Sequence, residues 1–176
     1  MRLGNSTMWK AVVAGIAVLG AGWFAMQGAT GRGARWDEKR DNVQLAPTGD
    51  PALERARAKA RSGLDGFLAR ADRPGPQDRN FGVKIALKGD GHVEHVWIAS
   101  FRRQGDGFVG RLDNEPRFVK SYKSGQTLTF ARGEIEDWMY RDGSVMRGNF
   151  TACALLANKP ADRERAEKQF GLRCEA

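Results

Sequence analysis

The spacing of hydrophobic and polar residues changes along the chain, and each change predicts a different element. Residues 11–29 contain no charged side chain, and a run of that length is close to what a helix needs to cross a bilayer. Apolar residues then recur at helical spacing over residues 53–71, and at alternate positions over residues 81–87. The pattern predicts an N-terminal transmembrane helix, an amphipathic helix and the first of several β-strands.

The N-terminal part is expected to be a membrane anchor over residues 1–30, followed by a linker over residues 31–49 that is rich in glycine and charge. An uncleaved single-span anchor is favoured over a signal peptide, because the apolar run is long and lacks a clear small-x-small cleavage site. A cleaved, secreted form is the alternative. Basic residues flank both ends of the run, so charge does not decide the orientation.

The remaining chain predicts one α+β domain over residues 50–157 and a C-terminal helix and tail over residues 158–176. Asp50 and Pro51 are typical of a helix start, and Gly-Asp turns separate the strands that follow. We expect the amphipathic helix to pack on a twisted antiparallel β-meander, with partial closure into a barrel as a variant. Beyond the strand that includes residues 81–87, the expected strands lie near residues 92–103, 108–112, 126–130 and 145–156.

Cys153 and Cys174 are the two cysteines of the chain. An even pair suits a disulfide in an oxidising compartment, although two unrelated buried thiols are the alternative. The bridge would stabilise the fold by about 3 kcal/mol in the chain-entropy model. It favours a domain outside the cytoplasm.

The stretch GHVEHVW contains both histidines, His92 and His95, with Glu94 between them. Side chains three positions apart on a strand point to opposite faces, so the two rings are not expected to share a metal ion. His95 is expected to share an apolar face with Val93 and Trp97. We therefore expect no metal site and no cofactor.

The formal net charge is +8, but basic and acidic residues alternate along the chain. This mixture is typical of a solvated surface. It lacks the basic and aromatic stripe on which nucleic-acid strands stack, and no nucleic-acid partner is expected.

Several segments in order resemble the YegJ-like family, a bacterial domain of unknown function numbered 2314. The resemblance covers residues 81–156, and more loosely the helix from Asp50. It implies a bacterial protein and offers no catalytic residues. The location expected from it and from the apolar run is the bacterial inner membrane, crossed once, with the domain in the periplasm. The segments that carry it are VEHVWI (93–98), GRLDNEP (110–116), GQTLTF (125–130), IEDWMY (135–140) and GNFT (148–151).

Two classes of function follow. A membrane-anchored, non-catalytic binding or accessory module with an envelope protein as partner is favoured, because no nucleophile or phosphate-binding motif is present. The alternative is a small hydrolase-like enzyme, if the strands bring its acid/base candidates together. The catalytic candidates are Glu94, His95, Asp113 and Asp137, and the candidate binding residues are Trp97, Asn114 and Trp138. For both sets, the competing interpretation is that the side chains only stabilise the fold.

Overall fold

Helix α2 (Pro51–Asp72) begins where the sequence predicts it. The Asp50 side chain accepts hydrogen bonds from the backbone N–H groups of Ala52 at 2.7 Å and Leu53 at 3.3 Å, which satisfies amides that have no partner inside the helix. One stripe of the helix is buried against the rest of the domain. It consists of Ala56, Ala60, Leu64, Phe67 and Leu68.

This computed structural model describes residues 49–174. The predicted anchor over residues 1–30, and the predicted linker apart from Gly49, lie outside that range. Among the described helices, none combines the length and the apolar character that crossing a membrane requires.

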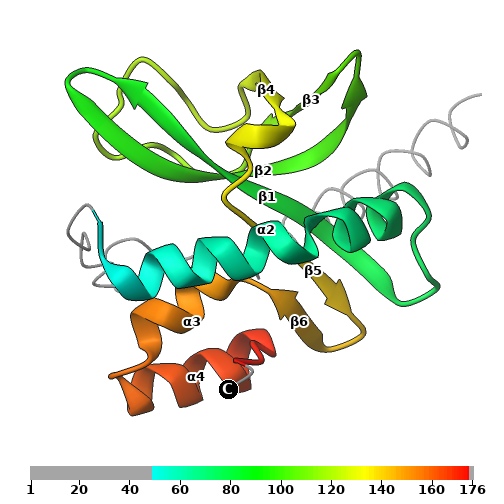
Figure 1. The fold of residues 1–176 in the computed structure, drawn as a ribbon, viewed down its shortest axis with the longest axis vertical. Coiled ribbons are helices and arrows are strands. Elements are labelled where there is room, and N and C mark those ends of the chain that lie inside the picture. Colours follow the sequence, from blue (N-terminus) through cyan, green and yellow to red (C-terminus); the bar gives the residue numbers. More distant parts are fainter. Residues whose placement is uncertain (1–48, 175–176) are drawn as a thin grey trace, which may run out of the picture. The chain divides into compact units, whose positions relative to one another are not determined.

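Six antiparallel strands form one sheet in the order β4-β3-β2-β1-β5-β6, with α2 running across it (Figure 1). The four strands from β1 to β4 pair in sequence, as the alternating pattern predicts. The strands are β1 (Asp78–Gly89), β2 (His92–Gln104), β3 (Gly107–Leu112), β4 (Thr127–Ala131), β5 (Asp137–Asp142) and β6 (Val145–Gly148).

The sheet is not the simple meander that the sequence predicts. After β4, a short 3-10 helix, η1 (Arg132–Glu134), leads the chain back to the far side of β1. There β5 pairs with β1, placing Val83 opposite Trp138 and Lys84 opposite Asp137. Strand β5 was not predicted, because pairing between strands distant in the chain has no local periodic signal.

The strand predicted over residues 145–156 was also wrong in its second half. Strand β6 ends at Gly148, and helix α3 (Phe150–Leu156) follows directly. Gly148 and Asn149 adopt positive φ angles of 78° and 56°, a left-handed conformation that ends an extended strand. Helix α4 (Pro160–Phe170) then ends at Gly171, as predicted.

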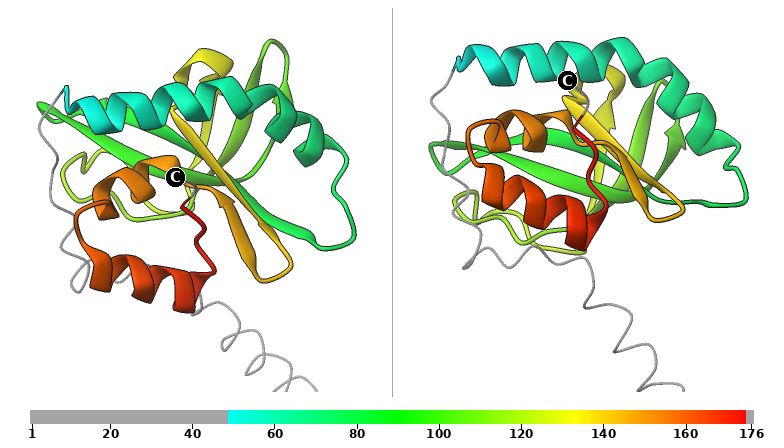
Figure 2. Two further views of the ribbon diagram at one scale, coloured as in Figure 1. Left: turned by 60° about the horizontal axis from the view of Figure 1, so that its bottom comes forward. Right: turned by 90° about the horizontal axis from the view of Figure 1, so that it is seen from below.

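Helices cover the two faces of the β5–β6 hairpin (Figure 2). Helix α2 lies on the face of the main core, where Phe67 packs with Val83 and Ile98. On the other face, Met146 of β6 packs with Ala166 of α4 and with Leu172. A disulfide joins Cys153 to Cys174, with their Cα atoms 5.4 Å apart. Cys153 lies on α3 and not on a strand as the sequence analysis placed it.

Candidate functional site

The carboxylate of Glu94 holds the loop between β3 and β4. It accepts hydrogen bonds from the backbone N–H groups of Arg117 at 2.7 Å, Phe118 at 2.8 Å and Val119 at 3.2 Å. A carboxylate occupied by three amides has few lone pairs left for other ligands. The geometry therefore gives Glu94 a role in loop conformation.

Asn114 attaches the same loop to β2. Its Oδ1 accepts a hydrogen bond from the backbone N–H of Trp97 at 2.9 Å, while the N–H of Asp113 donates to the carbonyl of Trp97 at 2.9 Å. The loop thus continues the ladder of β2 beyond the end of β3. The side chain of Asp113 itself is exposed.

Asp137 is fully buried and organises the start of α3. Its Oδ1 accepts from the backbone N–H groups of Trp138 at 2.9 Å and Phe150 at 3.2 Å. Its Oδ2 accepts from the N–H of Thr151 at 2.8 Å and from the Thr151 hydroxyl at 2.6 Å. Four donors satisfy a charge that would otherwise be costly to bury.

Strand register gathers a polar cluster on the sheet face opposite the main core. Lys84 is paired with Trp97 on one side and with Asp137 on the other. The ammonium of Lys84 donates a hydrogen bond to Thr151 Oγ1 at 2.6 Å and lies 4.6 Å from the centre of the Trp97 ring. Burial lowers the pKa of Lys84, although the negative charges of Asp137 and Glu136 oppose this change.

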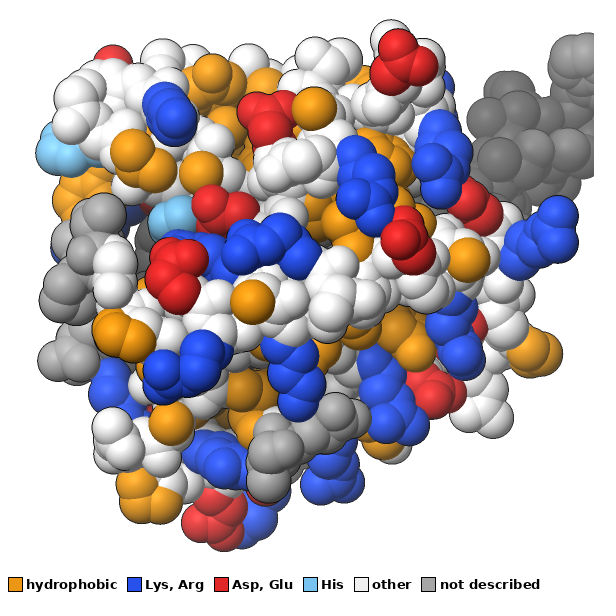
Figure 3. Space-filling model, in the orientation of Figure 1, with side chains coloured by type: hydrophobic (Ala, Val, Ile, Leu, Met, Phe, Trp, Pro, Cys, Tyr) orange, Lys and Arg blue, Asp and Glu red, His pale blue; other side chains and the backbone are white. Residues whose placement is uncertain are grey.

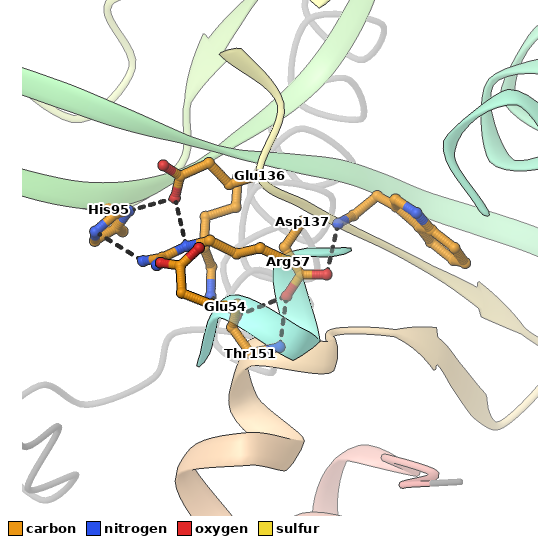
Figure 4. A network of polar contacts seen from close by, with 8 residues as sticks. Glu54, Arg57, His95, Glu136, Asp137 and Thr151 are labelled. Carbon is orange, nitrogen blue, oxygen red and sulfur yellow. Dashed lines mark hydrogen bonds and ion pairs between the residues drawn. The ribbon is translucent and has the colours of Figure 1, made fainter. Parts of the chain in front are cut away.

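The second half of the cluster joins β2 to α2 through ion pairs (Figure 4). His95 Nδ1 lies 2.6 Å from Glu136 Oε2, and Arg57 Nε lies 3.4 Å from the same oxygen. Arg57 also reaches Glu54 at 2.6 Å. The segment just before β5 is thereby tied to β2 and to the N-terminal half of α2.

The electrostatics of Glu136 follow from these neighbours. Burial by itself would raise the pKa of Glu136, but the contact with His95 and the nearby Arg57 guanidinium outweigh it and hold the pKa below its ordinary value. The carboxylate is therefore ionised at neutral pH. It acts as the shared acceptor of two basic side chains.

The orientation of His95 is fixed from both sides. A guanidinium has only donors, so the 3.3 Å contact between Arg57 Nη2 and His95 Nε2 requires this ring nitrogen to accept. The other ring nitrogen, Nδ1, points toward Glu136 and lies 2.6 Å from its Oε2. The side chain of His95 is 39% exposed, whereas that of Glu136 is 23% exposed.

The four catalytic candidates do not form one cluster. No hydrogen bond or ion pair joins any two of Glu94, His95, Asp113 and Asp137 within residues 49–174. In the same residues, no group of His, Cys, Asp and Glu side chains is arranged to hold a metal ion. The structure pairs His95 with Glu136, a residue that the sequence analysis did not select.

The two histidines of β2 lie in different surroundings from those predicted. The face of β2 that contains Val93 and His95 is not an apolar wall, because Val93 is 55% exposed and His95 is open to solvent. His92 is separate from this cluster, and its ring lies 5.5 Å from that of Phe118.

Several members of the cluster were not predicted from the sequence, among them Arg57, Lys84, Glu136 and Thr151. Lys84 and Arg57 follow the polar phase of their elements and look like ordinary surface residues. Glu136 and Thr151 could have been selected from the sequence, since they lie within the segments IEDWMY and GNFT that carry the family resemblance. Their partners are distant in the chain, so the contacts themselves could not be predicted.

Trp138 lies on the core side of the sheet. Its indole N–H donates to the carbonyl of Ala60 at 2.8 Å, and its ring stacks on Phe67 with centroids 4.9 Å apart. Gly63 passes close to the same ring, since a Cβ at this position would lie 3.0 Å from it. The position makes Trp138 an anchor for α2.

A groove of about 280 Å³ lies away from this cluster, between β1 and β4. Its walls combine apolar and polar side chains. They are Ile85, Ala86, Leu87 and Lys88 of β1, Tyr122 of the preceding loop, Leu128, Thr129 and Phe130 of β4, and Glu134 of η1.

Charged side chains of both signs surround α2 on the face drawn in Figure 3. The ion pairs of α2 include Arg70 with Asp78 and Asp72 with Arg103. The face is a mixed surface in keeping with the interleaved charges of the sequence.

The chain is similar to known bacterial proteins. A family model described as "Uncharacterized protein conserved in bacteria (DUF2314)" matches residues 50–173. The uncharacterized protein YegJ of Escherichia coli K12 is 28% identical over 137 residues, which cover 76% of this chain and 88% of YegJ. No solved structure matches the chain.

A more distant similarity involves a longer protein. The putative ankyrin repeat protein NMB1133/NMB1171 of Neisseria meningitidis serogroup B is 29% identical over 89 residues. The match covers 48% of this chain and 35% of that protein.

Proposed function

Since the chain belongs to the DUF2314 family of bacterial proteins, we propose that it is a membrane-anchored binding or accessory module of the cell envelope without catalytic activity of its own. The observation that carries the proposal is that polar residues of the motif segments bind the protein's own backbone. Glu94, Asn114 and Asp137 each accept hydrogen bonds from the backbone. Side chains occupied in this way determine conformation and do not face a substrate.

Two features of the chain support this location. The uncharged residues 11–29 are long enough for a single span, and a bridge between Cys153 and Cys174 persists in oxidising compartments. Both support an inner-membrane protein with its domain in the periplasm. An envelope protein is the proposed partner.

Photo-crosslinking in living cells tests the binding function. A photoreactive phenylalanine analogue would replace one exposed residue at a time on different elements: Arg102, Thr129 and Gln169. We expect an adduct of defined mass from at least one position. It should remain measurable when Glu94→Gln and His95→Ala are combined, because neither side chain is needed for binding. The absence of adducts from every position would contradict a binding module.

A second candidate function rests on the 2.6 Å contact between His95 and Glu136. A histidine oriented by a carboxylate is the arrangement of a general base, and this contact is what a small hydrolase-like enzyme would use. Against it, Arg57 occupies the other ring nitrogen. Complementation of a deletion strain separates the two functions: His95→Ala restores the phenotype if the module only binds and fails to restore it if the histidine does chemistry, provided that the adduct persists.

A further inference from the structure

Strand β1 has an outer edge that is only half covered. Along one side it pairs with β2 from Gly82 to Gly89, but on the other side β5 pairs with it only as far as Lys84. Of the remaining edge, residues 85–88 line the groove described above. An uncovered edge presents backbone donors and acceptors that can pair with another strand.

The backbone groups that face outward on this edge can be identified. The carbonyl of Lys84 accepts from the N–H of Glu136 at 2.9 Å, so it points away from β2. Orientation alternates with a period of two along a regular strand, and the register with β2 is unbroken from Gly82 to Gly89. The N–H and C=O groups of Ala86 and Lys88 therefore also point outward. Within residues 49–174, no hydrogen bond satisfies them.

The opposite wall of the groove is also a strand edge. The N–H of Ala131 donates to Glu134 Oε2 at 2.6 Å, and thus points away from β3. By the same alternation, the backbone groups of Thr129 and Thr127 face outward. The groove lies between two strand edges. Among the described residues, β4 has no partner on that side, and β1 has none past Lys84.

We propose that the groove binds an extended segment of a partner protein, which adds to β1 as a strand at Ala86 and Lys88. The inference rests on the binding function proposed above and assigns it a surface. Main-chain hydrogen bonds provide affinity in this mode of recognition, and pockets for alternate side chains provide specificity. The crossing segment at Glu136 and the turn at Asp90 limit the edge, so about five residues of the partner pair directly.

The chemistry of the segment follows from the two faces of β1. Side chains of the added strand that lie beside Ile85 and Leu87 meet Leu128 and Phe130, so these positions of the partner are apolar. Side chains on the other face lie beside the exposed Lys88, whereas the acidic residue of the lining, Glu134, is bound to the N–H of Ala131. The chain also carries a net charge of +8. Opposite charges on neighbouring strands attract. The segment therefore alternates apolar with acidic residues.

A peptide selection tests this assignment. Random decapeptides displayed on phage would be selected on the full-length chain in mild detergent, and the binders measured by fluorescence anisotropy. Selected peptides should alternate apolar and acidic residues, and Ala86→Pro should weaken their binding at least tenfold. Proline removes only an N–H that points away from β2, so no ladder bond is lost.

Two controls keep the result independent of folding. Ala86→Ser retains the N–H and should bind like the parent chain. N-methylation of the best peptide, one amide at a time, should abolish binding at every second position, because only alternate amides face β1. This scan changes the probe and leaves the protein intact.

The assignment is overturned if no peptide is selected, if the selected peptides lack alternation, or if binding tolerates both Ala86→Pro and methylation at every position. Cellular adducts from Arg102 or Gln169 would then still support a binding module, and only the groove would lose its role. A failure of both experiments would remove the proposed function itself.

Discussion

At the scale of single residues, the polar side chains of the motif segments act mainly as acceptors for the backbone. The sequence pointed to Glu94, Asn114 and Asp137 as special, and the structure explains their prominence by the loops and helix start that they hold. Their roles could not be predicted, since the amides that they bind, apart from the N–H of Trp138 next to Asp137, lie 13 or more residues away.

Asp137→Asn should lower the free energy of unfolding by about 2 kcal/mol. Asparagine keeps only one acceptor oxygen, so its NH2 group must face either the N–H groups of Trp138 and Phe150 or the N–H and hydroxyl of Thr151. Those buried donors then lose their acceptor. Urea unfolding followed by tryptophan fluorescence measures the change. Asp113→Asn is the matched control, because its exposed side chain should leave the midpoint almost unaltered. Equal midpoints for both variants would contradict the role of Asp137.

Glu136 should make stability depend on pH in the acid range. Its pKa is lower in the folded than in the unfolded chain, so its contribution is fully present above the unfolded value of about 4.3 and is lost as pH falls through the folded value. Glu136→Gln lacks this contribution at every pH. The difference in unfolding free energy between the variant and the parent should be constant above about pH 5.5 and narrow below it. A constant difference down to pH 3 would refute the ion pairing.

At the scale of elements, local patterns were sufficient where a segment makes its own contacts. Helix α2, helix α4 and strands β1 to β4 were predicted from periods of 3.6 and 2, from the Asp50 cap and from Gly171. Strand β5 and helix α3 were not, because a distant strand and the buried Asp137 determine them. For the same reason, the cluster of Lys84, His95 and Glu136 could not be predicted from the sequence.

The packing of α2 on β5 depends on Trp138. Trp138→Ala should destabilise the domain by about 3 to 5 kcal/mol, since a large ring in contact with Phe67 is lost and the carbonyl of Ala60 loses its donor. Trp138→Phe keeps most of the contact area and should cost much less. Chemical denaturation of both variants measures this order, and an unchanged midpoint for the alanine variant would remove Trp138 from the core.

At the scale of the whole molecule, the disulfide closes the C-terminal part of the chain. Cys153 and Cys174 are 21 residues apart, and replacing both with serine should lower the free energy of unfolding by about 3 kcal/mol. Amide hydrogen exchange should accelerate most in α4, which packs on the smaller of the two hydrophobic cores, formed by Met146, Ala166 and Leu172. Uniform acceleration over the domain would argue against a local role for the bridge.

The thiol state in cells tests the location of the domain. Alkylation with a mass tag should modify Cys153 and Cys174 only after reduction, because the bridge is stable in an oxidising compartment. A variant with both cysteines replaced by serine controls for background labelling. Labelling without reduction would place the domain in the cytoplasm and exclude periplasmic partners.

The crossover from β4 to β5 also has a consequence for biosynthesis. The ribosome completes Val83 long before its neighbour Trp138, which follows more than fifty residues later. At about 5–20 residues per second, the middle strand of the sheet waits several seconds for that neighbour. During this interval the nascent chain has an incomplete sheet, and its final hairpin must be inserted beside a strand that was made first. The edge of β1 that later pairs with β5 therefore exposes its backbone groups until that hairpin is complete.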